Sequence, residues 1–571
     1  MPVRPDRRTF LAGAGAVLSA AFAAVLVRGQ DGPADTALPN ARRISVREFG
    51  AAGDGRTDDT AAINRAIARC APGEALYFPA GRYRVSVSDG VERSLTPLPV
   101  GVHVLMEPEA WLLPSTADRV ISVFIPLGNN TLQVNVDGQS LPPGARVEDE
   151  AWRNSAHGVR AYARPDYGLG ASGVTVVNSR FRNLRHAIQT EGAQQWRIAD
   201  CEFERTMLSA VLLGYSDAGD CLNMLVENNR FQQLGDTAVA LYEVAGNRRG
   251  QGAHLTIAGN RARDYCLRTA GFAFDVEEGN ADRQHHIVMA DNIAEHSRTG
   301  LPHAVGGFTM GYVADGEMRN NVAVGAGNSN GDVGFNMLGC RNGVIAGNRA
   351  ENWRGAGVNT DGSSGVRVTD NDVIDCGGTN ANTPSIRLSY HFDTSDITVS
   401  NNRVLVRAGY AHVGPGAIAI GAIAGAGRSI RGIRITGNVI TAPLDIGIAI
   451  YGTDSSPARD VTVSENRILG GTPGLFGSFA VHVVRSANGT IDRNVVEDGR
   501  FGIAVQHSRS VAIEGNQFAG STPMEVGFEV GNSTGLIVRG NRASVPVKVP
   551  LQSGGGSISY QDNALGSPPR Q

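Results

Sequence analysis

Asparagine recurs at the end of a short β-like phrase through most of this 571-residue chain. In the phrase Val461-Thr-Val-Ser-Glu-Asn466-Arg-Ile468, aliphatic residues alternate with polar ones, asparagine follows a polar pair, and another aliphatic residue comes two positions later. A phrase that returns about every 22 to 36 residues indicates a repeat architecture. One repeat cannot bury its apolar face alone, so neighbouring repeats must stack and share a core. The repeated asparagines are Asn229, Asn260, Asn292, Asn321, Asn348, Asn371, Asn402, Asn438, Asn466, Asn494, Asn516 and Asn541.

The residues between these phrases favour strands over helices. Strand-length runs such as Gly447-Ile-Ala-Ile450 and Gly502-Ile-Ala-Val505 are bounded by Gly, Asn, Asp and Ser. The chain has neither an amphipathic helical run in every repeat nor the leucine skeleton of a leucine-rich repeat. A side-chain amide can donate to the coil on one side and accept from the coil on the other. The pattern therefore predicts a parallel β-helix with the asparagines in one column, and Ser179 and Cys201 occupy the asparagine position in two earlier phrases.

Composition limits the partners and the chemistry. The 73 glycines and the low aromatic content of 6% suit tight turns around a core of small aliphatic side chains. A formal net charge of -3 gives no basic footprint for nucleic acid or for an anionic membrane. The only lysine is Lys548, near the C-terminus, which excludes a mechanism that needs a lysine base in the middle of the chain.

The two ends of the chain look different from the repeats. Arg7-Arg8-Thr9-Phe10-Leu11 and the apolar run to Val27 resemble a twin-arginine export signal. The run is short for a membrane span of about 20 residues, so membrane contact is expected only through an uncleaved signal. We predict a signal peptide and linker over residues 1–39, a β-helix over 40–550, a flexible tail over 551–571, and a periplasmic or secreted location.

Six scattered cysteines, without a Cys-x-x-Cys pair, favour buried thiols over disulfides or a metal site. We therefore predict no bound metal and no cofactor; calcium is compatible with the sequence but not indicated by it.

The segment from Ile44 to Tyr83 resembles a known family. It reads Ile44-Ser-Val-Arg-Glu-Phe-Gly-Ala-Ala-Gly-Asp54-Gly-Arg-Thr-Asp58-Asp-Thr-Ala-Ala-Ile, and later Leu76-Tyr-Phe-Pro-Ala-Gly-Arg-Tyr83. This is similar to the opening segment of the pectate-lyase-like superfamily, in particular its polygalacturonase, rhamnogalacturonase and epimerase-like group. The resemblance implies an all-β, single-stranded right-handed parallel β-helix (solenoid) with a short N-terminal capping helix.

The residues themselves support that capping helix. Asp58, Asp59 and Thr60 offer oxygen atoms for a helix N-terminus. The apolar stripe of the helix is then formed by Ile63, Ala66, Ile67 and Cys70. We expect Asp54, Asp58 and Asp59 to be structural.

The resemblance also implies carbohydrate chemistry on an exposed strand face, with a polysaccharide or oligosaccharide as partner and no nucleic acid. Polygalacturonases carry Asn-Thr-Asp, a pair of aspartates, Gly-His-Gly and Arg-Ile-Lys. This chain has Asn359-Thr-Asp361-Gly362, but Asp375-Cys376 stands where the aspartate pair should be, and Gly-His-Gly is absent. One motif of four does not support that specific activity.

Aligning the coils on their asparagines shows which side chains face outward, because alternate strand residues point to opposite faces. Polar, ionisable and aromatic residues concentrate in the middle of the chain. The predicted substrate-binding residues are Tyr242, Glu277, Tyr312, Asn336 and Asn359, and the predicted catalytic residues are Glu243, Asp275, Asp361, Arg387, Tyr390 and His391.

Two alternatives for the chemistry stay open. Glu243 and Asp275 on neighbouring coils suit the acid and partner of a glycoside hydrolase, which lie about 5 to 9 Å apart. Arg387 beside Asp361 can instead bind a uronate carboxylate while Tyr390 or His391 takes a proton, as in a lyase or epimerase. The rival class is a non-catalytic β-helix for glycan binding, adhesion or cell-envelope structure. We expect His285, His286, His296 and His303 to be solvated loop residues.

Overall fold

The computed structural model describes residues 41–86, 93–115, 121–138, 146–147, 156–164, 168–169, 171–214, 220–241, 252–276, 284–327, 333–377, 383–407, 417–441, 446–469 and 479–565. They fall into two compact units, the N-terminal unit up to residue 297 and the C-terminal unit from residue 298. Each unit is described by itself. The predicted signal peptide over residues 1–39 lies outside the described residues.

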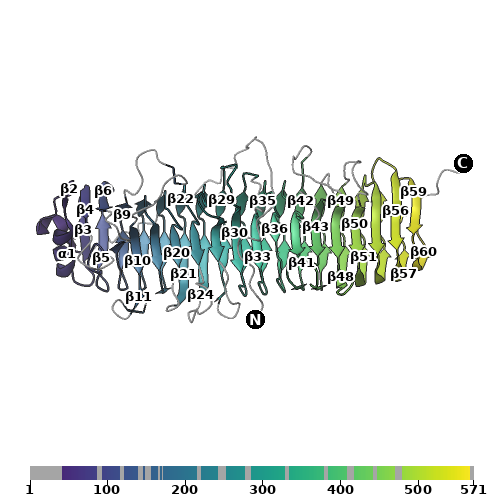
Figure 1. Ribbon diagram of the computed structural model, residues 1–571, viewed down its shortest axis with the longest axis horizontal. Coiled ribbons are helices and arrows are strands. Elements are labelled where there is room, and N and C mark those ends of the chain that lie inside the picture. The colour runs from purple at the N-terminus through teal and green to yellow at the C-terminus, as the bar shows by residue number, and fades with distance from the viewer. Residues whose placement is uncertain are drawn as a thin grey trace. The chain divides into compact units, whose positions relative to one another are not determined.

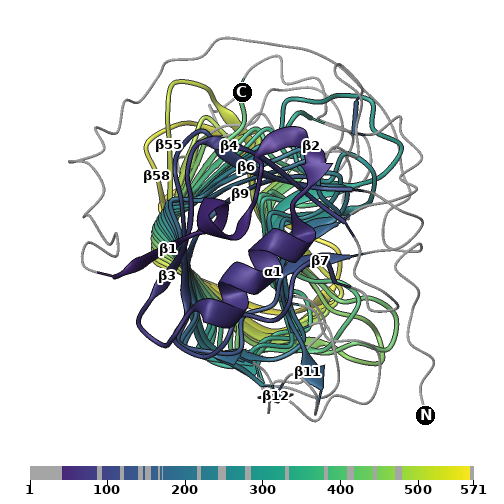
Figure 2. The same cartoon turned by 90° about the vertical axis from the view of Figure 1, so that its left-hand side faces the viewer.

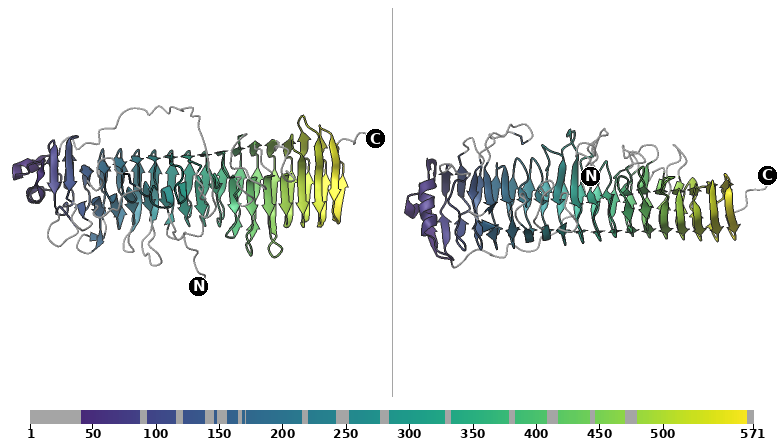
Figure 3. Two further views of the ribbon diagram at one scale, coloured as in Figure 1. Left: turned by 45° about the horizontal axis from the view of Figure 1, so that its top comes forward. Right: turned by 60° about the horizontal axis from the view of Figure 1, so that its bottom comes forward.

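Within each unit, successive coils contribute strands to three parallel sheets, which we call A, B and C (Figures 1 and 3). The predicted all-β parallel β-helix is confirmed. A strand of one coil pairs with the equivalent strand of the next coil, as Val358 of one strand pairs with Ile386 of the next.

In the N-terminal unit, sheet A contains β1 (Arg43–Ser45), β3 (Ala75–Phe78), β5 (His103–Met106), β8 (Thr131–Gln133), β13 (Ala171–Ser172), β14 (Thr175–Val177), β17 (Ala193–Gln194), β18 (Arg197–Ala199), β21 (Cys221–Glu227), β24 (Gly252–Ala258), β27 (Gln284–His285) and β28 (Val288–Ala290). Sheet B contains β2 (Asp54–Asp58), β4 (Gly81–Val85), β6 (Ala110–Pro114), β9 (Asn135–Asp137), β15 (Arg180–Arg182), β19 (Glu202–Glu204), β22 (Arg230–Gln232), β25 (Arg261–Arg263) and β29 (Ile293–Glu295). Sheet C contains β7 (Ser122–Phe124), β10 (His157–Ala161), β16 (His186–Thr190), β20 (Val211–Leu213), β23 (Val239–Leu241) and β26 (Gly271–Val276). A separate antiparallel pair is formed by β11 (Ala163–Arg164) and β12 (Gly168–Leu169).

In the C-terminal unit, sheet A contains β31 (Glu317–Arg319), β34 (Val344–Ala346), β37 (Arg367–Thr369), β40 (Thr394–Ser395), β41 (Thr398–Ser400), β44 (Ile430–Arg431), β45 (Arg434–Thr436), β48 (Ala458–Ser464), β51 (Ser486–Asp492), β54 (Arg509–Glu514), β57 (Ser533–Arg539) and β60 (Gly556–Gln561). Sheet B contains β32 (Val322–Val324), β35 (Arg349–Glu351), β38 (Asp372–Ile374), β42 (Arg403–Leu405), β46 (Val439–Thr441), β49 (Arg467–Leu469), β52 (Val495–Glu497), β55 (Gln517–Ala519) and β58 (Arg542–Ala543). Sheet C contains β30 (Val305–Gly311), β33 (Phe335–Leu338), β36 (Val358–Asn359), β39 (Ile386–Ser389), β43 (Ile418–Ile423), β47 (Ile446–Tyr451), β50 (Phe479–Val484), β53 (Phe501–Gln506), β56 (Met524–Gly531) and β59 (Val547–Ser553).

A buried ladder of asparagines runs along each unit between sheets A and B. The side-chain amide of Asn466 donates to Oδ1 of Asn494 at 3.0 Å and to the carbonyl of Ile435 at 2.9 Å. Its backbone N–H donates to the same Oδ1 at 3.0 Å. Its own Oδ1 accepts two equivalent bonds from Asn438. The pattern repeats from Asn321 to Asn563. Within the C-terminal unit the predicted column is therefore present, and it extends one coil further than the predicted series.

The N-terminal unit carries the same ladder. Asn229, Asn260 and Asn292 are linked in the same way. The backbone N–H of Cys201 donates to Oδ1 of Asn229 at 2.9 Å, so Cys201 holds the asparagine position as predicted. The core beside the ladder includes a stack of Phe181, Phe203 and Phe231, with ring centroids 5.3 and 4.8 Å apart.

A short helix lies across the N-terminal end of the N-terminal unit (Figure 2). This helix, α1 (Thr60–Arg69), buries Ile63, Ala66 and Ile67, and it follows a short 3-10 turn, η2 (Val46–Phe49). Asp58 accepts a hydrogen bond from the backbone N–H of Thr60 at 3.0 Å. The carboxylate of Asp59 accepts instead from the backbone of residues 52 and 53, so it holds the preceding loop and does not cap the helix. The described residues contain no helix that is long and apolar enough to cross a membrane.

The C-terminal boundary differs from the prediction. A flexible tail was expected from residue 551, yet β59 pairs with β56 and β60 pairs with β57. Gly555, between these strands, has φ of 109°, and Gly556, the first residue of β60, has φ of 108°. Glycine reaches such conformations without steric cost, so the stretch continues the fold.

Removing one amide from the ladder should destabilise the C-terminal unit. Asn466 is fully buried, and Asn466→Ala would leave the carbonyl of Ile435 and the N–H of Asn438 without their partners. Buried polar groups that lose their partners cost about 1 to 3 kcal/mol each. We expect a lower melting temperature by circular dichroism, with a loss of about 3 kcal/mol in unfolding free energy. Gln517→Ala, on the exposed face of β55, is the matched control, and equal melting of the two variants would contradict the role of the ladder.

Two buried histidines should make the N-terminal unit sensitive to acid. The rings of His157 and His186 stack at 5.3 Å, and Nδ1 of His186 lies 2.7 Å from the carbonyl oxygen of Ser209. Burial lowers the pKa of His186 to about 3, and burial also lowers the pKa of His157. Because both folded pKa values lie below the ordinary value of 6.5, the unfolded chain binds more protons as the pH falls from 6.5 towards 3.

Stability should therefore fall over that window, by about 3 kcal/mol at pH 4 from His186 alone. Thermal melts of the wild type and of His186→Gln from pH 7 to pH 4 measure the effect, and the variant should show a flatter dependence. The exposed His507 provides the control variant His507→Gln, whose pH dependence should match that of the wild type. Parallel pH curves for wild type and His186→Gln would show that His186 is not responsible.

Candidate functional site

A row of hydrogen-bonded polar side chains crosses four coils on sheet C of the C-terminal unit. Thr309, Asn336, Asn359 and Arg387 are in register on β30, β33, β36 and β39. Nδ2 of Asn336 donates to Oγ1 of Thr309 at 3.0 Å, and Nδ2 of Asn359 donates to Oδ1 of Asn336 at 2.6 Å. Nε of Arg387 donates to Oδ1 of Asn359 at 2.8 Å. The structure thus brings three predicted site residues, Asn336, Asn359 and Arg387, into one connected row.

The row ends in a half-buried guanidinium. Burial lowers the pKa of Arg387, and the nearby Asp361 acts in the opposite direction. Because the ordinary pKa of an arginine side chain is 12.5, the guanidinium stays cationic at neutral pH. Asn359 orients the guanidinium through Nε, and the fork of an arginine suits a carboxylate ligand.

Asp361 organises the turn that follows β39. Its carboxylate is fully buried and accepts backbone N–H bonds from Tyr390 at 3.0 Å, from His391 at 2.9 Å and from Phe392 at 3.2 Å. Three successive amides that converge on one anion form a nest. The prediction placed Asp361 among the catalytic carboxylates. Because both oxygens accept bonds from the turn, its contacts point instead to positioning Tyr390 and His391.

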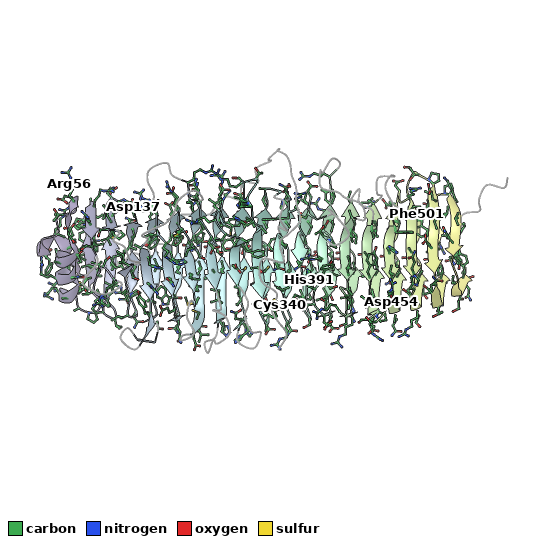
Figure 4. All side chains as sticks on the ribbon, in the orientation of Figure 1. Arg56, Asp137, Cys340, His391, Asp454 and Phe501 are labelled. Carbon is green, nitrogen blue, oxygen red and sulfur yellow. The ribbon has the colours of Figure 1, made fainter. Side chains whose placement is uncertain are left out.

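Those two predicted residues lie together at the edge of the row. The rings of Tyr390 and His391 meet edge to face, with centroids 4.5 Å apart. Figure 4 labels His391, a residue that is exposed overall although its ring is partly covered. Burial of the ring lowers the pKa of His391, the cationic Arg387 and Arg428 add to this, and Asp361 opposes it. The imidazole is therefore neutral at pH 7 and can accept a proton.

Two neighbours of this turn were not predicted. Phe392 packs on Gly362, which has φ of 73°, so that a Cβ at that glycine would lie 2.9 Å from the Phe392 Cβ. The guanidinium of the exposed Arg428 lies 5.9 Å from the ring centroid of Phe392. Arg428 belongs to the turn after β43. Strand alternation does not apply in a turn, so it could not predict where this side chain lies.

Further along the same sheet, a second pair of polar side chains was also missed. In register, Arg387 is followed by Gly421, Ala449 and His482. Nδ1 of His482 lies 2.9 Å from the hydroxyl of Tyr451, and burial lowers the pKa of His482 to about 4. Tyr390 and Tyr451 both pack against a small apolar cluster, which consists of Ile418, Ile423, Ile446 and Ala449. The alternation of side chains along the strand over residues 479–484 is the sequence signal that could have identified His482.

The remaining predicted site residues are more scattered. Tyr312, 37% exposed, lies in the turn after β30, with its ring against Gly339. In the N-terminal unit, Asp275 on β26 pairs in register with Ala240 and is 1% exposed. Tyr242, Glu243 and Glu277 lie outside the described residues, so the proposed pairing of Glu243 with Asp275 has no described geometry.

One of the predicted loop histidines is not solvated. His296 is buried, with Nε2 3.0 Å from the carbonyl oxygen of Tyr265, because the coil folds its ring against that tyrosine. His303 is half-buried.

Comparison with known proteins supports the fold at both ends of the described chain. Residues 43–89 match the family described as rhamnogalacturonase A/epimerase, pectate lyase-like. Residues 304–468 and 419–564 match the family described as right handed beta helix region.

Individual relatives match over short segments. Mannuronan C5-epimerase AlgE1 of Azotobacter vinelandii is 44% identical over 63 residues, which are 11% of this chain and 4% of the relative. Alginate lyase 7 of the same organism is 55% identical over 47 residues, which are 8% of this chain and 6% of the relative. The chain thus covers only a small part of these relatives' lengths.

Among solved structures, a tailspike protein mutant of E. coli bacteriophage HK620 in complex with a pentasaccharide aligns with a TM-score of 0.41 at 14% identity. The alignment covers 86% of this chain and 78% of that chain.

The resemblance stated from the sequence is therefore confirmed: residues 43–89 are a pectate lyase-like segment of the rhamnogalacturonase A/epimerase kind, and residues 304–564 are a right-handed β-helix region.

Proposed function

We propose that the C-terminal unit binds a uronate-containing polysaccharide along sheet C and acts on it as a polysaccharide lyase or epimerase. The observation that carries this proposal is the joint placement of Arg387, Tyr390 and His391, with Asp361 holding the turn. These three groups supply a carboxylate partner and two groups that can exchange protons.

The charge around the turn favours an acidic sugar. Arg387 and the exposed Arg428 both act on His391 electrostatically, so two cationic groups lie near one imidazole. The carboxylate of Asp361 is already engaged by backbone amides. A uronate carboxylate can form two parallel hydrogen bonds with a guanidinium, and this pairing is stronger than a neutral hydrogen bond.

The proposed reaction begins with removal of the proton on C5, next to the uronate carboxylate. The cationic Arg387 stabilises the negative charge that then develops on the carboxylate, and neutral His391 accepts the proton. Water then supplies a proton to C5 from the opposite face, or the hydroxyl of Tyr390 supplies one to the leaving oxygen at C4. Tyr390 does not serve the opposite face, because its ring is in contact with that of His391 at 4.5 Å. The first outcome inverts C5, and the second breaks the C4–O bond and leaves an unsaturated uronate.

The named relatives support this choice of substrate class, because they are described as mannuronan C5-epimerases and an alginate lyase. The twin-arginine pattern at Arg7 and Arg8 supports export to the periplasm or beyond, where such polymers are found, as a further part of the proposal.

Replacing the guanidinium should abolish the reaction without unfolding the protein. The full-length chain is incubated with polymannuronate, polygalacturonate and a neutral glucan. The assays measure unsaturated uronates, deuterium uptake at C5 in heavy water, and new reducing ends. We expect activity on an acidic polymer, lowered about 100-fold or more in Arg387→Ala and partly retained in Arg387→Lys. Arg434→Ala, an exposed arginine on β45 of sheet A, is the matched control and should keep full activity.

Other results have distinct meanings. Reducing ends without unsaturation, lost in Asp275→Asn, would replace the proposal by hydrolysis. Binding to the polymers without turnover would favour a non-catalytic glycan-binding β-helix.

The pH dependence should follow the imidazole. Because the pKa of His391 lies below its ordinary 6.5, the neutral base persists at pH 7, and kcat should fall as the pH drops through that lowered pKa. In His391→Gln the residual rate should lose this acidic limb. If kcat of His391→Gln still fell at the same acidic pH as in the wild type, a residue other than His391 would be the base.

A further inference from the structure

Three histidines meet at one corner of the N-terminal unit. His285 ends β27, His286 follows it, and His254 lies on β24 in the preceding coil. One ligand nitrogen from each of the three side chains lies within 4.8 Å of the other two. Among the residues that the structure describes, this is the only group of three or more histidine, cysteine or acidic side chains with such spacing.

The backbone explains why the rings converge. Ala253 pairs with His285, which puts His254 opposite His286 in the next coil. Both residues adopt φ of 55°, in a column of left-handed corners that includes Gln195 and Asn223. Equivalent corners in stacked coils project their side chains in the same direction. As a result the rings of His254 and His286 stack at 5.0 Å, and that of His285 meets both nearly at right angles.

The spacing suits a metal ion. Nδ1 of His285 lies 2.8 Å from Nδ1 of His286. Two imidazole nitrogens bound to one ion at about 2.0 to 2.1 Å must lie roughly 3 Å apart, so only small side-chain movements are needed. His254 and His286 are exposed and His285 is half-buried, so an ion can enter from solvent and keep water as a further ligand.

We propose that His254, His285 and His286 form a binding site for a transition-metal ion, with Zn²⁺ as the ion that it takes. Imidazole nitrogen suits zinc, copper, nickel and iron, whereas calcium and magnesium require oxygen ligands. The ion joins two successive coils of the N-terminal unit. Since the two ligand segments lie about 30 residues apart in the chain and meet only when the coils stack, metal binding stabilises the folded unit.

Binding is also coupled to protons. The short contact between the two Nδ1 atoms is a hydrogen bond that requires a proton on one of them, and a metal that binds both atoms displaces that proton.

The test uses the full-length protein without a histidine tag, dialysed against a chelator and titrated calorimetrically with ZnCl₂ at pH 7.5, with CaCl₂ as the contrasting ion. His254→Asn and His286→Asn remove single ligands, and asparagine already occupies a left-handed corner of the same column at Asn223. His507→Asn is the matched control, because His507 is also an exposed histidine at a left-handed corner, with φ of 51°.

We expect one Zn²⁺ per chain, no comparable binding of Ca²⁺, and affinity lowered by at least about tenfold in the two site variants but not in His507→Asn. The melting temperature should rise with Zn²⁺ only where the site is intact, and the spectrum of bound Cu²⁺ should show nitrogen ligands that the site variants lose. Circular dichroism confirms that each variant is folded. Absence of a zinc site in the wild type, or equal affinity in wild type and both site variants, would overturn the proposal.

Discussion

The asparagine ladder is the interaction on which the other features depend. In each unit, a ladder asparagine that is followed by another links its own backbone N–H and its side-chain amide to the asparagine of the next coil. These bonds are buried, and a slip of one residue would leave both donors without acceptors. The ladder therefore fixes the register of the coils. Residues that are far apart in the chain consequently become neighbours at the spacing of adjacent strands.

Fixed register is what builds the polar row in the C-terminal unit. Asn336, Asn359 and Arg387 come from three different coils, yet they form consecutive hydrogen bonds because their strands pair residue for residue. The same constraint aligns His254 with His286 in the N-terminal unit. In a solenoid, a side chain placed at one repeat position acquires partners from the repeats before and after it.

Corners matter as much as strands for what the sites can do. Many corners hold Asn, Asp or Gly in the left-handed conformation, which these residues adopt at little cost. Other residues take such positions too: His286, with φ of 55°, is exposed, whereas Cys266, with φ of 51°, is buried. In the turn after β39, the Asp361 carboxylate accepts hydrogen bonds from three backbone amides. These bonds fix the positions of Tyr390 and His391.

The sequence by itself determined the parallel coils, the asparagine column and the alignment of Asn336, Asn359 and Arg387 on successive coils, because these follow from a repeated phrase and from strand alternation. Only the tertiary structure decided the part that Asp361 plays, the burial of His296, and the meeting of His254 with His285 and His286. Each of these depends on how a turn is shaped and on which coil lies beside it. Local periodicity describes one strand at a time, so it does not report contacts that form when turns of different coils stack.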